Sequence, residues 1–106
     1  MSLPTEKHVE EWLHKLGETD EAYAQACASL TAAKERLKVA KMEGLPDEGT
    51  ALEREKAAYT SRAYKDAIAA LRDAEANKKL LELRREQWSL GIDVWRSLNA
   101  NQRRTS

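Results

Sequence analysis

Two histidines, His8 and His14, are the side chains of this chain with the widest range of possible chemistry. Six residues separate them, which places them on different faces of a helix, whereas convergence on one helix needs a spacing of four. Glu10 and Glu11 lie between them, but a metal site built from these groups would need a partner chain. We therefore expect structural or solvated roles for both histidines and no bound metal.

A catalytic nucleophile has no better support in the sequence than a metal site has. Cys27 is the single cysteine, and its alanine-rich surroundings hold no histidine that could activate a thiol, so it is expected to act as a small apolar filler. The carboxylates are scattered as singles and pairs. A glycine-rich phosphate loop, a Gly-x-Ser-x-Gly motif and zinc-ligand spacing are all missing. The sequence predicts a protein without enzymatic activity or cofactor.

Basic residues gather in the last third of the chain, with Trp88 and Trp95 between them. Aromatic rings among cations can stack the bases of single-stranded nucleic acid. Both tryptophans also continue an apolar heptad pattern, however, so burial in a core or an interface explains them better, and the cations then form a solvated rim. Nucleic-acid contact is the alternative, through Lys78, Lys79, Arg84, Arg85, Arg96, Arg103 and Arg104.

The composition indicates one helical domain over residues 1–106. Charged residues make up 34% of the chain, with only 4 Gly, 2 Pro and no Phe, which is typical of long exposed helices. Residues 1–50 carry a net charge of −4 and residues 51–106 carry +4, as expected for an acidic arm packed against a basic one. With one cysteine, no signal-peptide core and no apolar run near the ~20 residues of a membrane span, we expect a cytoplasmic protein without a membrane segment.

Apolar periodicity predicts three helices, over residues 5–16, 20–43 and 51–98, followed by a polar tail over 99–106. Thr5 is suited to cap the first helix, and the Thr-x-x-Glu run that begins at residue 50 is a capping box for the third. The sequence leaves open whether Gly17 ends the first helix or whether the first two helices join with a kink.

Both long segments carry an apolar seam with heptad spacing, the pattern of helices that pack as coiled coils. The first seam comprises Tyr23, Ala26, Leu30, Ala33, Leu37 and Ala40. The second comprises Ala57, Thr60, Tyr64, Ala67, Leu71, Ala74, Lys78, Leu81, Arg85, Trp88, Ile92 and Trp95. A tight link near Asp47 then makes an elongated antiparallel hairpin, in which we expect Leu37 near Ala57, Leu30 near Tyr64, Tyr23 near Leu71 and Trp12 near Glu82.

A second apolar stripe begins on the third predicted helix after residue 79, and a helix with a broad apolar face is buried on more than one side. In the predicted pairing the helix over 20–43 is used up near Ala74, so much of this face needs another cover. Burying a large apolar side chain stabilises by ~1.5–3 kcal/mol, so we predict self-association into a helical bundle, as a two-fold homodimer. The sequence leaves open whether the copies pair parallel or antiparallel, or assemble to a higher order. The predicted interface comprises Leu80, Leu81, Leu83, Trp88, Leu90, Ile92, Val94, Trp95 and Leu98.

The run EQWSLGIDVWRSLNANQRR, residues 86–104, resembles the C-terminus of small helical proteins of tailed phages and prophages. Those proteins close with a Trp-Arg-Ser-x-x-Ala-Asn-Arg-like run, matched here by Trp95, Arg96, Ser97, Asn99, Ala100 and Asn101. The likeness extends loosely over residues 53–71. It implies a place in a phage-infected or lysogenic bacterial cell and an accessory role near recombination functions.

We therefore expect a phage- or prophage-derived accessory protein that acts as a homodimer through an unidentified protein partner. The alternative is a recombination accessory protein that binds DNA through its basic last third.

Overall fold

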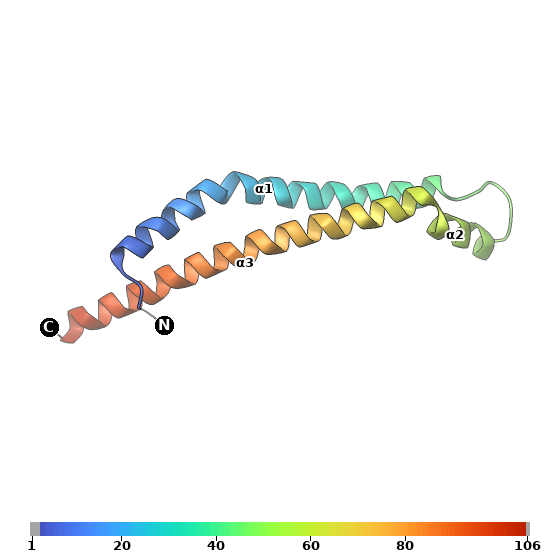
Figure 1. The fold of residues 1–106 in the computed structure, drawn as a ribbon. Coiled ribbons are helices and arrows are strands. Elements are labelled where there is room, and N and C mark those ends of the chain that lie inside the picture. The colour runs from blue at the N-terminus through green and yellow to red at the C-terminus, as the bar shows by residue number, and fades with distance from the viewer. Residues whose placement is uncertain (1–2, 106) are drawn as a thin grey trace. The chain divides into compact units, whose positions relative to one another are not determined.

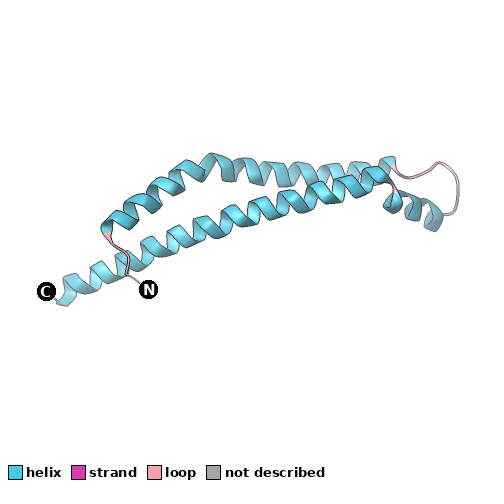
Figure 2. Ribbon diagram, viewed as in Figure 1, coloured by secondary structure: helices cyan, strands magenta, loops and turns pink. Residues whose placement is uncertain are grey.

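The computed structural model describes residues 3–105, and every regular element in that range is a helix. Helix α1 spans Glu6–Glu43, α2 spans Ala51–Thr60 and α3 spans Arg62–Thr105 (Figure 1; Figure 2). Helices α1 and α3 pack antiparallel, which confirms the predicted all-α hairpin. Their contacts fall into a terminal unit, Met1–Ala24 with Lys79–Ser106, and a middle unit, Gln25–Lys78.

Helix α1 is continuous through Gly17, so residues 5–16 are not a separate helix, and the joined arrangement is the one that forms. The Thr19 hydroxyl donates to the carbonyl oxygens of Lys15, at 2.8 Å, and Leu16, at 3.2 Å. It therefore bonds back into the helix that already exists and does not cap a new one.

Small side chains form the core of the middle unit. Ala26, Ala33 and Ala40 are buried at every seventh position of α1, and Ala58 of α2 is fully buried. Alanine at these positions lets backbones approach closely: a Cβ atom added to Gly44 would lie 3.1 Å from the Cα atom of Ala58. Half-buried Leu30, Leu37, Tyr64, Ala67, Leu71 and Ala74 complete the packing, as the heptad seams predict.

The capping box that opens α2 is confirmed. The backbone N–H of Glu53 donates to the Thr50 hydroxyl at 3.2 Å, and the Thr50 N–H donates to a Glu53 carboxylate oxygen at 3.4 Å. Just before it, Gly49 adopts a φ of 112°, a left-handed conformation that glycine takes without strain. The Arg54 side chain donates to the carbonyl oxygen of Pro46 at 2.7 Å, which ties the link to α2.

The predicted single helix over residues 51–98 is wrong, because the backbone leaves the helical region at Ser61, with ψ at 149°. The Ser61 hydroxyl donates to the carbonyl oxygen of Ala58 at 2.7 Å and accepts from the N–H of Tyr64 at 3.2 Å. One hydroxyl thus closes α2 and caps α3. Ala57 and Thr60, which were expected to continue the seam, are exposed.

The predicted polar tail over residues 99–106 is also wrong for its described part, since α3 continues to Thr105. After Gly91 the sequence has neither glycine nor proline to stop the helix. Arg103 and Arg104 lie in the last turn, where positive charge interacts favourably with the helix dipole.

The break at Ser61 changes the pairing register from the one predicted. Tyr23 hydrogen-bonds Glu82 and does not lie beside Leu71, while Trp12 lies against Gly91 and not near Glu82. The shift is close to the 10 residues of α2, because these residues no longer belong to the helix that pairs with α1. The start of α1 consequently covers the part of α3 that the predicted register left open.

Replacing Ser61 with alanine is expected to lower the free energy of unfolding by about 1–2 kcal/mol, because α3 loses its N-cap and α2 its closing bond. Ser29→Ala removes the same group from an exposed position inside α1 and is expected to leave stability unchanged or slightly higher, since alanine favours helix. Urea unfolding followed by circular dichroism compares the two variants. Equal stability of Ser61→Ala and the wild type would contradict the capping role.

Candidate interaction surface on α3

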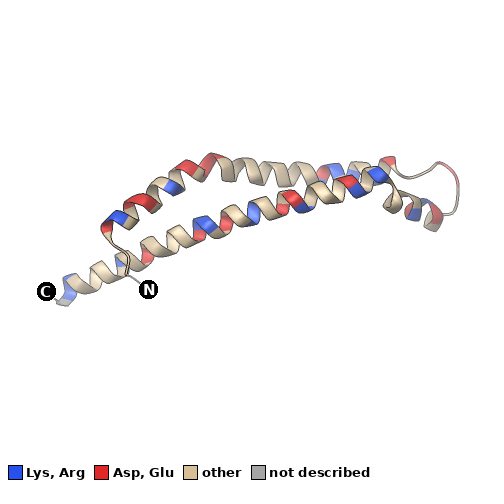
Figure 3. Ribbon diagram, in the orientation of Figure 1, with Lys and Arg blue, Asp and Glu red and all other residues tan. Residues whose placement is uncertain are grey.

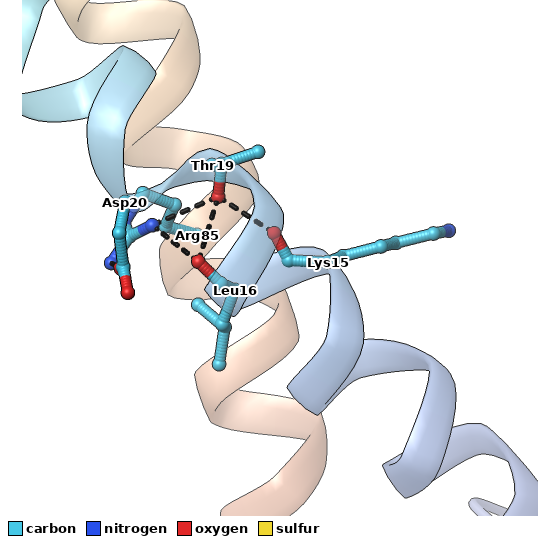
Figure 4. Close-up of polar contacts among 5 residues, drawn as sticks. All are labelled: Lys15, Leu16, Thr19, Asp20 and Arg85. Carbon is cyan, nitrogen blue, oxygen red and sulfur yellow. Dashed lines mark hydrogen bonds and ion pairs between the residues drawn. The ribbon is translucent and has the colours of Figure 1, made fainter.

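The terminal unit is held together by the guanidinium group of Arg85, which reaches a turn of α1 (Figure 4). One terminal nitrogen donates to the Leu16 carbonyl oxygen at 2.9 Å and to the Thr19 hydroxyl at 2.8 Å, and the other meets an Asp20 carboxylate oxygen at 2.7 Å. The group also lies 5.3 Å from the ring centroid of Tyr23. Because three acceptors surround a cation that is only 22% exposed, Arg85 fixes the position of α1 along α3.

Two further contacts agree with this register. The Tyr23 hydroxyl donates to a Glu82 carboxylate oxygen at 3.1 Å. The ring of Trp12 lies over Gly91 so closely that a Cβ atom at that position would come within 2.7 Å of it. Glycine at residue 91 therefore provides the space that the indole occupies.

The seam of α3 faces α1 in this unit. Val9 and Ile92 are buried, and the Lys15 ammonium group lies 5.8 Å from the ring of Trp88. Leu81, Trp88 and Trp95 are half-buried along the same line. These residues, which were predicted to contact a second copy, therefore lie on the side of α3 that faces α1 of the same chain.

The nine residues predicted for the oligomer interface divide into two faces. Five of them lie on the seam side or are otherwise half-buried: Leu81, Trp88, Ile92, Trp95 and Leu98. The other four, which we call the outer stripe, are 41–64% exposed: Leu80, Leu83, Leu90 and Val94. At 3.6 residues per turn, the outer stripe lies roughly 140° around α3 from the seam. Helix α3 therefore presents one apolar face to α1 and a second one outward.

Open grooves flank the outer stripe on both sides. One is lined by Leu16 and Tyr23 of α1 together with Glu86, Leu90 and Asp93 of α3. The other is lined by His8, Trp12, Gln87, Leu90, Gly91 and Val94. Leu90 lines both grooves, so it forms the crest between them.

The basic residues predicted as nucleic-acid contacts are not brought together on one face. Arg85 points into α1, Lys78 is half-buried, and the ammonium group of Lys79 lies 3.9 Å from Glu82. Lys79 and Arg84 lie roughly 140° apart around the helix. Arg84, Arg96, Arg103 and Arg104 are exposed. Acidic and basic residues are interspersed along α3 as far as Asp93, and the charged residues that follow it, Arg96, Arg103 and Arg104, are all basic (Figure 3).

The two histidines occupy separate places. The imidazole of His8 accepts the backbone N–H of Thr5 at 3.1 Å at the predicted N-cap, and its ring stacks on Trp12 with centroids 5.6 Å apart. His14 meets Glu18 at 2.7 Å on an exposed face. Glu11 precedes His14 by three residues, so the Glu-x-x-His spacing used in di-metal bundles is present on α1. Within residues 3–105, however, histidine, cysteine and carboxylate side chains form no group of three that could hold a metal ion.

Cys27 is half-buried on α1. None of the helices described here is long and apolar enough to cross a membrane.

Two features that position this surface were not predicted from the sequence. Ser61 has the residue type of an N-cap, but the unbroken heptad pattern around it concealed the helix break. Gly91 is the lone glycine between residues 51 and 98, but its contact with Trp12 depends on the register of α1 and α3, which the sequence alone does not give.

Comparison with known proteins adds no relative. No family model, curated protein or solved structure matches the chain. The likeness of residues 86–104 to phage and prophage proteins therefore stays a prediction, and the function is inferred from the surfaces of the chain itself.

Replacing Arg85 with lysine is expected to lower the free energy of unfolding by about 1–3 kcal/mol, because an ammonium group cannot reproduce the fork of hydrogen bonds to Leu16, Thr19 and Asp20. Arg84→Lys, the same exchange at the neighbouring exposed position, is expected to change stability by less than about 0.5 kcal/mol. Chemical unfolding curves measure both. Similar stabilities of the two variants would mean that the Arg85 contacts do not hold α1 in place.

The two glycines inside long helices are expected to respond in opposite ways to alanine. Gly17→Ala should raise the free energy of unfolding by about 0.5–1 kcal/mol, because its added methyl group meets nothing within 4 Å and alanine favours helix. Gly91→Ala should lower it by about 1–3 kcal/mol, because the methyl group displaces Trp12. Thermal unfolding and tryptophan fluorescence report the two effects, and a stabilising Gly91→Ala would contradict the packing of Trp12.

Proposed function

We propose that the protein is a non-enzymatic interaction protein that self-associates through the outer stripe as a homodimer and presents this assembly to a further protein partner. The observation that carries the proposal is the outer stripe itself, four large apolar side chains in one line, each 41–64% exposed. They lie roughly 140° around α3 from the seam, so folding of the single chain covers them only in part. A contiguous apolar face of this kind marks an interaction site.

The spacing of the outer stripe fits a helix of a second copy packed along it. The stripe follows the heptad spacing by which helices pack along one another, with Gln87 as its polar member. Each leucine is about half exposed in the single chain, so covering it would contribute roughly 1 kcal/mol, and a two-fold arrangement uses each residue twice. Charged side chains border the stripe, which gives the apolar centre and polar rim of a protein interface.

The cellular setting of the protein, like its self-association, is a proposal. The likeness of residues 86–104 to phage and prophage proteins supports an accessory role in the cytoplasm of an infected or lysogenic bacterium. Recovery of a phage- or host-encoded protein with the tagged chain from such cells would support it. DNA binding has less support, because the predicted cations are not gathered on one face: Arg85 points into α1 and Lys79 lies beside Glu82. The basic residues Arg96, Arg103 and Arg104 do follow the last acidic residue of α3, Asp93.

Substituting lysine for both Leu83 and Leu90 is expected to weaken dimerisation by about 100-fold or more while leaving the helical content unchanged, because both side chains are exposed in the single chain. Leu52→Lys, at a 76% exposed position of α2, serves as the matched control and should leave dimerisation intact. Sedimentation equilibrium at micromolar concentration measures all three proteins. A wild-type chain that sediments purely as the 12.0 kDa monomer would contradict the proposed homodimer.

A further inference from the structure

The charges beside the outer stripe are unequally distributed along α3. Its beginning is bordered by the exposed cations Lys79 and Arg84, and its end by the exposed anions Glu86 and Asp93. Other charged side chains of this stretch are engaged on the side of α1, since Arg85 bonds α1 and Glu82 accepts from Tyr23. The outward face therefore has a basic half followed by an acidic half.

We infer that the two copies of the homodimer pair antiparallel along α3, so that the basic half of each stripe lies against the acidic half of the other. This inference rests on the homodimer proposed above and adds its orientation. Leu80 and Leu83 of one copy then lie against Leu90 and Val94 of its partner, and Lys79 lies beside the partner's Asp93. A two-fold axis close to residue 86 generates each of these contacts twice.

Helical geometry identifies which flanking residues meet. Numbering the stripe as heptad positions a and d makes Leu80, Gln87 and Val94 the a residues and Leu83 and Leu90 the d residues. Lys79, Glu86 and Asp93 then border one side of the stripe, whereas Arg84 borders the other.

An antiparallel pair brings the first of these sides against its own copy. Lys79 then faces the partner's Asp93 in two attractive contacts, whereas Glu86 meets its own copy near the axis in a single like-charged contact. A parallel pair instead brings opposite sides together, which places Lys79 beside the partner's Arg84 in two like-charged contacts. Unlike charges at such flanking positions select helix orientation, so the antiparallel pair is favoured.

Reversing one charge tests the orientation through the sign of its effect. Lys79→Glu is expected to weaken dimerisation by roughly ten-fold in low salt, because it faces the partner's Asp93, and Asp93→Lys should act similarly. The double variant Lys79→Glu with Asp93→Lys should dimerise within about three-fold of the wild type. In a parallel dimer Lys79→Glu would instead tighten association, because glutamate would lie beside the partner's Arg84.

The double variant also controls for effects inside one chain. Lys79 lies 3.9 Å from Glu82, so Lys79→Glu disturbs that contact as well. Lysine at position 93 cannot repair it, and recovery in the double variant must therefore come from the contact between copies. Sedimentation equilibrium gives the dissociation constants, and the differences should shrink as salt is raised.

A distance between copies provides a second measurement that does not depend on charge. A spin label at Ala100→Cys, in a chain with Cys27→Ser, lies 14 residues from the axis near residue 86. At 1.5 Å per residue, the two labels should be about 40 Å apart in the antiparallel dimer and within about 20 Å in a parallel one. A dimer with the short distance, or with tighter association by Lys79→Glu, overturns the orientation and leaves the homodimer standing. A monomeric wild type removes both proposals and assigns the stripe to a different occupant.

Discussion

The helical hairpin depends on one hydroxyl group, that of Ser61, because it decides which residues belong to the helix that pairs with α1. By bonding the Ala58 carbonyl and the Tyr64 N–H, it ends one helix and starts the next. The 10 residues of α2 are thereby removed from the helix that pairs with α1. The contacts of the terminal unit agree with this change, including Trp12 on Gly91 and Arg85 on the turn at Asp20.

The register also decides which apolar side chains of α3 are core and which remain outside. The seam residues, Ile92 among them, face α1, and Leu83 and Leu90 stay on the far side of the helix. A single helix thus carries two apolar faces. One packs against α1 within the chain, and the other, formed by Leu80, Leu83, Leu90 and Val94, stays 41–64% exposed.

Local sequence signals predicted the local structure well. The cap at Thr5, the capping box at Thr50 and the alanine seam of α1 all depend on near neighbours or on a simple repeat, and all were confirmed. The break at Ser61 was missed because the heptad spacing continues through it, so periodicity held no sign of a stop. The start of α1 reaching Gly91 was missed for a different reason, since it requires the three-dimensional register that the break creates.

Arg85 has a consequence for how the chain finds its fold. A seam that repeats every seven residues can slide by one heptad and still match apolar against apolar. Such slippage toward the start of α1 would set the guanidinium group against Leu13 and Trp12, where it would lose the acceptors it has at Thr19 and Asp20. Burying an unpaired cation costs several kcal/mol, so misaligned hairpins are rejected. Arg85, a polar residue within the apolar seam, thus disfavours pairings of α1 and α3 that are shifted by one heptad.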